Sequence, residues 1–150
     1  MNRKEEEADL LRECQLLYQL RSSSYIVDIE EIFLYKDRRY VFLEYMEGRS
    51  ISEIVESRYL HYDEDFIKYT IWCVAKGLKE MHDEDVLHRD LKADNILCRP
   101  DGQVKVADLG SSMPLTNKEH YRTTRDKTTL YLRPPEMIQR KPYDKKCDIW

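Results

Sequence analysis

The chain has 150 residues, of which 36% are charged and 41% hydrophobic, and this length suits one domain or part of a larger one. Its 29 acidic and 25 basic residues give a net charge of -4, which argues against a general nucleic-acid binder. No segment approaches the roughly 20 apolar residues of a membrane-spanning helix, and residues 1–7 lack the apolar core of a signal peptide. The four cysteines are scattered without a Cys-x-x-Cys pair. We therefore expect no disulfide framework, no zinc site, no membrane insertion and a reducing compartment, cytoplasmic or nuclear.

The first third of the chain predicts a helix followed by short strands. Leucines at helical spacing indicate a helix over about residues 5–20: Leu10, Leu16, Leu17 and Leu20. Three β-rich runs follow at 26–29, 32–35 and 40–45. Lys36-Asp37-Arg38 is the expected turn of a hairpin between the last two runs.

A longer helix and a second hairpin are predicted next. The helix should span about 63–82, because five apolar residues step by four and three and would form one buried stripe: Ile67, Ile71, Val74, Leu78 and Met81. Short strands are expected at 86–87, 96–98 and 104–106. The last two should pair, since Asp101-Gly102 readily supplies a positive φ. Residues 109–130 are expected to form an extended loop with a functional role.

Polar groups with catalytic potential are concentrated in residues 88–95, His-Arg-Asp-Leu-Lys-Ala-Asp-Asn. Asp90 and Asn95 supply oxygen donors, and Lys92 places a cation between them. The predicted hairpin folds position 108 back beside position 95, so Asp108 and Asn95 should come together. Oxygen ligands of this kind suit Mg²⁺, which typically takes one or two protein ligands and completes its shell with phosphate oxygens.

These residues occur in motifs that resemble those of eukaryotic protein kinases of the serine/threonine type. His88-Arg89-Asp90 with Lys92 and Asn95 is similar to the catalytic loop, and Asp108-Leu109-Gly110 to the D-F-G element. Pro134-Pro135-Glu136 resembles the end of the activation segment, and Asp148-Ile149-Trp150 the start of the long helix that follows it.

The resemblance covers nearly the whole chain and implies an α+β, protein-kinase-like two-lobed fold that is present in part. Residues 1–46 or so would form the end of the small lobe and the hinge. Residues 47–150 would form the first half of the mainly helical large lobe, with the catalytic loop and the activation segment.

The resemblance also assigns roles to individual residues. Asp90 would accept the proton of a substrate hydroxyl, and Lys92 would neutralise charge on the transferring phosphate. Asn95 and Asp108 would hold Mg²⁺ against the phosphates of ATP. Four residues at the expected gatekeeper, hinge and adenine floor would bind the rest of the nucleotide: Leu43, Glu44, Met46 and Leu97.

Further residues would act in structure or regulation. Thr129, like Lys92, is typical of serine/threonine rather than tyrosine kinases. Arg89 resembles the arginine that grips a phosphorylated activation loop, so an upstream activating kinase is implied. The residue that would accept the phosphate stays open among Thr123, Thr124 and Thr128. Arg125 occupies the usual place of the phosphothreonine. Glu136 would pair with an arginine of the later large lobe, and His88 would pack in the core rather than act as a base.

Glu13 shares a helix face with Leu16, Leu17 and Leu20, so its carboxylate needs a cation from elsewhere. In the family, this glutamate pairs with a lysine on a preceding strand. Only twelve residues precede Glu13, and neither that strand nor a glycine-rich loop is among them. Three functions therefore stay open: a kinase acting on Ser/Thr hydroxyls of a protein substrate, a catalytically inactive scaffold or decoy, and a remnant that cannot fold alone.

Overall fold

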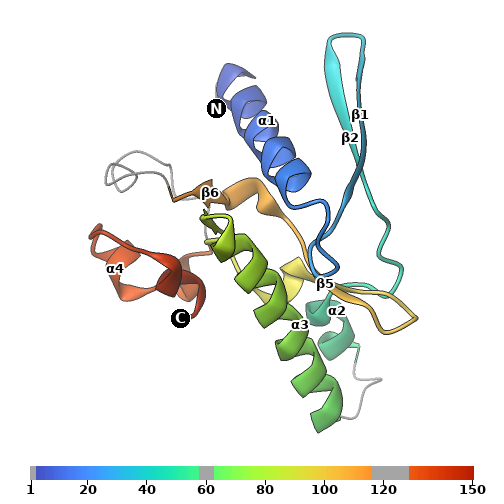
Figure 1. The fold of residues 1–150 in the computed structure, drawn as a ribbon, viewed down its shortest axis with the longest axis vertical. Helices are drawn as coiled ribbons and strands as arrows, with labels where there is room; N and C mark the ends of the chain where they lie inside the picture. The colour runs from blue at the N-terminus through green and yellow to red at the C-terminus, as the bar shows by residue number, and fades with distance from the viewer. Residues whose placement is uncertain (1–2, 58–62, 116–128) are drawn as a thin grey trace.

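The computed structural model describes residues 3–57, 63–115 and 129–150, in which short antiparallel strand pairs lie among helices (Figure 1). The α-helices are α1 (Arg3–Gln19), α2 (Ile51–Glu56), α3 (Glu64–Asp83) and α4 (Pro135–Ile138). The strands are β1 (Ile29–Tyr35), β2 (Arg38–Leu43), β3 (Val86–Leu87), β4 (Ile96–Cys98), β5 (Val104–Val106) and β6 (Met113–Pro114). The described residues also contain the short 3₁₀ helices η1 (Ala93–Asn95), η2 (Leu109–Ser111), η3 (Leu130–Leu132) and η4 (Lys145–Asp148).

Helix α1 confirms the predicted first helix and contributes to a large apolar cluster. Acidic residues in its first turn complement the positive end of the helix dipole. Its buried Leu16 and Leu17, with Leu20 just beyond its end, pack with Leu109 and Met81 in one core cluster. The helix is thereby held against the segment that follows Asp108.

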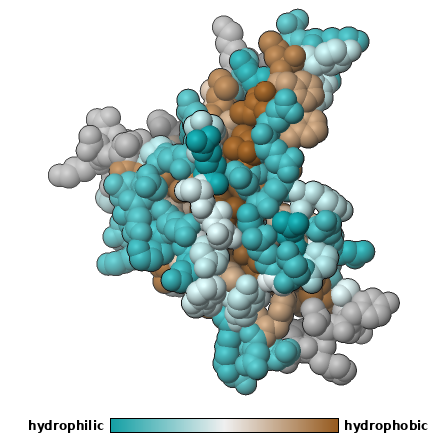
Figure 2. Space-filling model, turned by 45° about the vertical axis from the view of Figure 1, so that its right-hand side comes forward, coloured by the Kyte–Doolittle hydropathy of each residue, from teal (hydrophilic) through white to brown (hydrophobic). Residues whose placement is uncertain are grey.

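The β1–β2 hairpin stands beside α1 and is largely exposed on both faces (Figure 1). Lys36 and Asp37 both have positive φ, the geometry of a tight hairpin turn, and Arg38 already belongs to β2. Figure 2 shows hydrophobic side chains gathered along this upper part of the molecule. The predicted strand end at residue 45 is wrong, because β2 ends at Leu43 and Glu44 donates its N–H to Asp28.

The β4–β5 hairpin is confirmed and forms the centre of the molecule. Ile96 pairs with Val106 and Cys98 with Val104, and Gly102 in the turn has a φ of 90°. The predicted strand at 26–29 is only partly correct. Its first residues lie parallel to β5 through an isolated Ile26–Val106 bridge, and β1 begins at Ile29.

Helix α3 has the predicted bounds within one residue, but its buried face is rotated from the predicted stripe. Ile67 and Ile71 are 41% and 62% exposed, so the stripe is wrong in its first half. The face turned inward carries Cys73 and Gly77. A Cβ placed on Gly77 would lie only 3.0 Å from the carbonyl oxygen of Tyr25, and this close backbone approach sets the rotation of the helix.

Three local features differ from the sequence predictions. Helix α2 was not predicted, although Ser50 and Glu53 form a reciprocal capping box at its start. The predicted loop at 109–130 begins instead with η2 and with β6, which pairs with β3. Asp148, the predicted first residue of the following long helix, is the last residue of the 3₁₀ helix η4. Residues 116–128 lie outside the described residues, and with them Thr123, Thr124, Arg125 and Thr128.

Within residues 3–57, 63–115 and 129–150, no helix has both the length and the apolar character needed to cross a bilayer.

Candidate active site

Asp90 is buried at the centre of a polar cluster that joins segments far apart in the chain. Its Oδ1 accepts a hydrogen bond of 2.7 Å from the backbone N–H of Thr129. Its Oδ2 lies 3.0 Å from Nζ of Lys92, which also donates to the Thr129 hydroxyl at 3.1 Å. The structure therefore brings Thr129, which lies far along the chain, to Asp90 and Lys92 of the predicted catalytic loop.

The contacts within this cluster keep the carboxyl of Asp90 and the amine of Lys92 charged. Burial by itself would raise the pKa of the Asp90 carboxyl, but hydrogen bonds from Thr129 and Lys92 outweigh it and hold that pKa below its usual value. The hydrogen bond to Asp90 in turn raises the pKa of the Lys92 ammonium. At neutral pH the site thus offers a carboxylate acceptor next to a fixed cation.

Asn95 and Asp108 lie on neighbouring chain segments, as the hairpin predicted. The N–H of Ala107 donates to the carbonyl of Asn95 at 2.8 Å, which sets residue 108 beside residue 95. The side-chain amide of Asn95 donates to the carbonyl of Asp90 at 2.9 Å, so its oxygen is the atom left to accept. Asp108 is exposed and left-handed, with a φ of 62°, and its Oδ1 accepts from the N–H of Gly110.

The oxygen donors of Asn95 and Asp108 fit a Mg²⁺ ion whose remaining ligands are phosphate oxygens. No group of three or more His, Cys, Asp or Glu side chains among the described residues is arranged to hold a metal. One amide oxygen from Asn95 and one exposed carboxylate from Asp108 match the small number of protein ligands that Mg²⁺ takes when phosphate oxygens complete its shell. When bound, the ion would neutralise negative charge on those phosphates.

The predicted nucleotide-binding residues lie next to this hairpin. Met46 is buried in a small cluster with Val27 and Ala107, and Leu97 of β4 packs against that cluster. Glu44 is half-buried immediately after β2, whereas Leu43 is 40% exposed. The structure therefore places Met46 and Leu97 together, and Leu43 is the last residue of β2.

Two other predicted residues contact the segment that follows Asp108. A Cβ placed on Gly110 would lie 3.5 Å from Oε2 of Glu13 and 3.0 Å from Oδ1 of Asp108, so this glycine sits between the two carboxylates. Arg89 donates from Nε to the carbonyl of Ser111 at 2.7 Å. Glu136 is half-buried in the first turn of α4.

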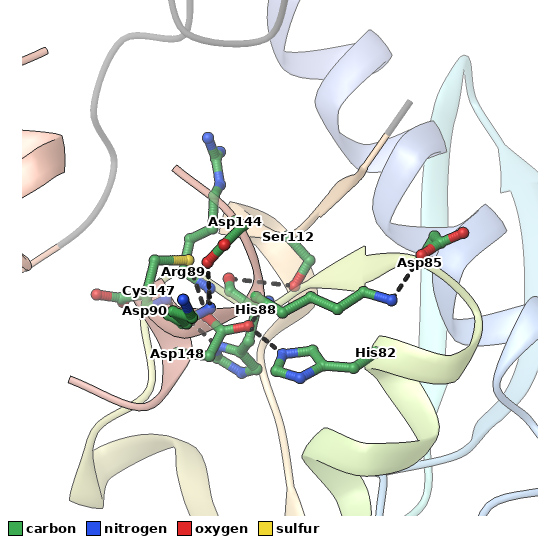
Figure 3. Close-up of polar contacts among 11 residues, drawn as sticks. His82, Asp85, His88, Arg89, Asp90, Ser112, Asp144, Cys147 and Asp148 are labelled. Carbon is green, nitrogen blue, oxygen red and sulfur yellow. Dashed lines mark hydrogen bonds and ion pairs between the residues drawn. The ribbon is translucent and has the colours of Figure 1, made fainter. Parts of the chain in front are cut away.

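Asp148 was not predicted as a site residue, although its carboxylate positions the catalytic loop (Figure 3). Its two oxygens accept the backbone N–H groups of His88 and Arg89 at 2.9 and 2.7 Å, and one also lies 2.8 Å from Nε2 of His82. Arg89 has a φ of 69°, a backbone conformation that these bonds hold in place. The signal in the sequence was an aspartate in an apolar segment, where a carboxylate requires partners.

His88 is completely buried, which agrees with the predicted packing role. Its Nδ1 accepts from the N–H of Asp90, so the proton belongs on Nε2, which faces the carbonyl of Ala107 at 3.1 Å. Burial lowers the pKa of this imidazole, more than the nearby carboxylates raise it. A neutral, fully hydrogen-bonded ring of this kind is a structural element rather than a base.

The structure has a loop with a buried, ionised aspartate. The adjoining hairpin adds oxygen donors and an apolar surface beside them. Together these features define a partial protein-kinase-like α+β fold. The family model of the protein kinase domain matches residues 1–150, so the chain belongs to the protein kinase domain family. The predicted resemblance is thereby confirmed.

Curated relatives support the same assignment. The serine/threonine-protein kinase CLA4 of Candida albicans is 36% identical over 126 residues, which cover 83% of this chain and 13% of that protein. The serine/threonine-protein kinase pakB of Dictyostelium discoideum is 38% identical over 126 residues, covering 83% and 15%. SKM1 of Saccharomyces cerevisiae, also a serine/threonine-protein kinase, is 34% identical over 135 residues, covering 85% and 19%. The chain thus spans between 13% and 19% of the length of these relatives.

Proposed function

We propose that this chain is catalytic-domain sequence of a protein serine/threonine kinase, which transfers the γ-phosphate of ATP to a hydroxyl of a protein substrate. The observation that carries the proposal is the Asp90–Lys92–Thr129 cluster, in which a buried carboxylate is kept ionised beside a fixed cation. Relatives named as serine/threonine-protein kinases support this function.

The roles of the residues follow from their contacts. The ionised Asp90 would orient the substrate hydroxyl and take its proton, because its carboxylate is held in place from two sides. Lys92 would stabilise charge on the transferring group. Asn95 and Asp108 would hold Mg²⁺, which neutralises the phosphate oxygens of ATP when it is bound.

The base of ATP would lie between the hinge and β4. Met46 and Leu97 supply the apolar surface, and the backbone of Glu44 and Met46 would meet the polar edge of adenine, with Leu43 at the border. The proposal also includes a boundary between small-lobe and large-lobe sequence near residues 46 and 47.

Regulation and location are also part of the proposal. Arg89 would hold a phosphorylated activation segment supplied by an upstream kinase, Glu13 would support the small-lobe side of the site, and Glu136 would anchor the end of that segment. We place the protein in the cytoplasm, or in the nucleus, and expect it to bind neither nucleic acid nor a membrane. The four cysteines are buried and free of disulfide bonds, as in a reducing compartment.

The test is transfer of labelled γ-phosphate from Mg·ATP to a mixture of Ser- and Thr-containing peptides by the protein purified at its native length. Asp90→Asn should lower the rate by about 10²–10⁴-fold, the usual loss when a general base is removed. Asp108→Asn should raise the Mg²⁺ concentration required. Asp101→Asn is the matched control, because this exposed carboxylate caps the β4–β5 turn away from the cluster.

Two outcomes would contradict the proposal: no transfer by the wild-type protein, or an Asp90→Asn variant that is as fast as wild type. A wild-type protein that unfolds cooperatively but transfers no phosphate would instead support the inactive scaffold.

A further inference from the structure

Lys105 is a buried cation to which the proposed chemistry assigns no role. Its side chain is 7% exposed, on the middle residue of β5. A buried ammonium group is costly unless a carboxylate compensates it. Its Nζ donates to Oε1 of Glu44 at 2.5 Å, so the pair joins the central hairpin to the residue after β2.

The same Glu44 oxygen is held by a third segment. It accepts the backbone N–H of Asp28 at 2.7 Å, and the N–H of Glu44 donates to the carbonyl of Asp28 at 3.0 Å. Glu44 is thus bonded through both its side chain and its main-chain nitrogen. Its carbonyl is the main-chain group left to face a ligand.

The position of Lys105 on β5 places this ion pair beside the predicted adenine floor. Lys105 is the cross-strand partner of Leu97, and directly paired residues of an antiparallel hairpin project from the same face. The other face of the hairpin carries Ile96 and Val106, which pack with Cys73 of α3. Lys105 and Leu97 therefore share the face that meets Met46 and Ala107.

We propose that Lys105 is a positioning residue for the nucleotide base: through Glu44 it fixes the hinge segment 44–46 against the β4–β5 hairpin. The proposal rests on the proposed function, and it concerns the base rather than the phosphates. Loss of the ion pair should loosen the hinge, while Asn95 and Asp108 keep their places on the backbone of the hairpin.

The experiment compares two probes on the native-length protein by isothermal titration: Mg·ADP, which carries the base, and Mg·tripolyphosphate, which does not. In Lys105→Met the Kd for Mg·ADP should rise about tenfold, while the Kd for Mg·tripolyphosphate stays within about twofold. Lys105→Arg, which keeps the charge, should restore most of the Mg·ADP affinity. Lys79→Met is the matched control, since Lys79 forms an exposed ion pair with Asp83 on α3.

A second variant separates positioning from folding. Lys105→Met leaves Glu44 without its cation and can lower the melting temperature. Lys105→Met with Glu44→Gln removes the uncompensated charge, keeps an acceptor for the N–H of Asp28 and should largely keep the melting temperature. The double variant should still bind Mg·ADP about tenfold more weakly. Equal weakening of both probes, or unchanged binding of both, overturns the role of Lys105. A wild-type protein that binds neither probe overturns the proposed function itself.

Discussion

In the β1–β2 hairpin no residue of either strand is buried, whereas around the catalytic loop even polar side chains are. The buried polar residues there are His88, Asp90, Asn95, Ser111, Ser112 and Asp148. The hairpin is held by contacts between near neighbours, such as the stacked rings of Phe33 and Tyr40. The catalytic loop is held by residues up to 60 positions away, as in the bond from the N–H of His88 to Asp148.

This difference means that the two regions should respond differently to substitution. Buried polar groups are costly when they lose a partner, so single changes near the loop should affect the whole fold. Exposed cross-strand pairs contribute little each, so single changes in the hairpin should stay local.

The largest effect is expected for Asp148→Ala. The substitution leaves the N–H groups of His88 and Arg89 without their acceptor, and we expect the free energy of unfolding in urea to fall by about 3–5 kcal/mol. The control Asp83→Ala removes an exposed carboxylate and should leave that free energy nearly unchanged. Similar losses in the two variants would remove the contrast between buried and exposed polar groups.

A smaller effect should appear with pH. Since burial lowers the pKa of His88 in the folded protein, the unfolded chain binds this proton more readily, and stability is lost as the pH falls below about 6.5. The slope from one such group cannot exceed about 1.4 kcal/mol per pH unit. His88→Gln should flatten the dependence of the free energy of unfolding between about pH 5 and 6.5. An unchanged slope in this variant would show that His88 does not titrate on unfolding.

The smallest effect is expected in the hairpin. Phe33→Ala removes the ring that stacks on Tyr40 and Phe42 and should cost about 0.5–1 kcal/mol. Amide hydrogen exchange should speed up in residues 29–43 and stay unchanged in the catalytic loop. Leu34→Ala, at a position 65% exposed, serves as the control and should alter exchange less. Faster exchange around Asp90 would show that the two regions open together.

Much of the fold was predictable because it depends on local signals. Leucine spacing located α1, and Asp101-Gly102 located the turn between β4 and β5. The capping box at Ser50 and Glu53 could have located α2 by the same reasoning. The buried face of α3 was not predictable in this way, since the close approach of Gly77 to Tyr25 selects it.

The residues of the candidate site also fall into two groups, those that local signals predict and those that only the structure reveals. The sequence by itself determined the family motifs, the two hairpins and the choice of Asp90, Lys92, Asn95 and Asp108, because these depend on residue type and short-range spacing. Only the tertiary structure decided that Thr129 closes on Asp90 and that Asp148 and Lys105 act as buried partners. The physical reason is that a buried charge has to find its counterpart in space, and nothing in the local spacing of residues says where along the chain that counterpart lies.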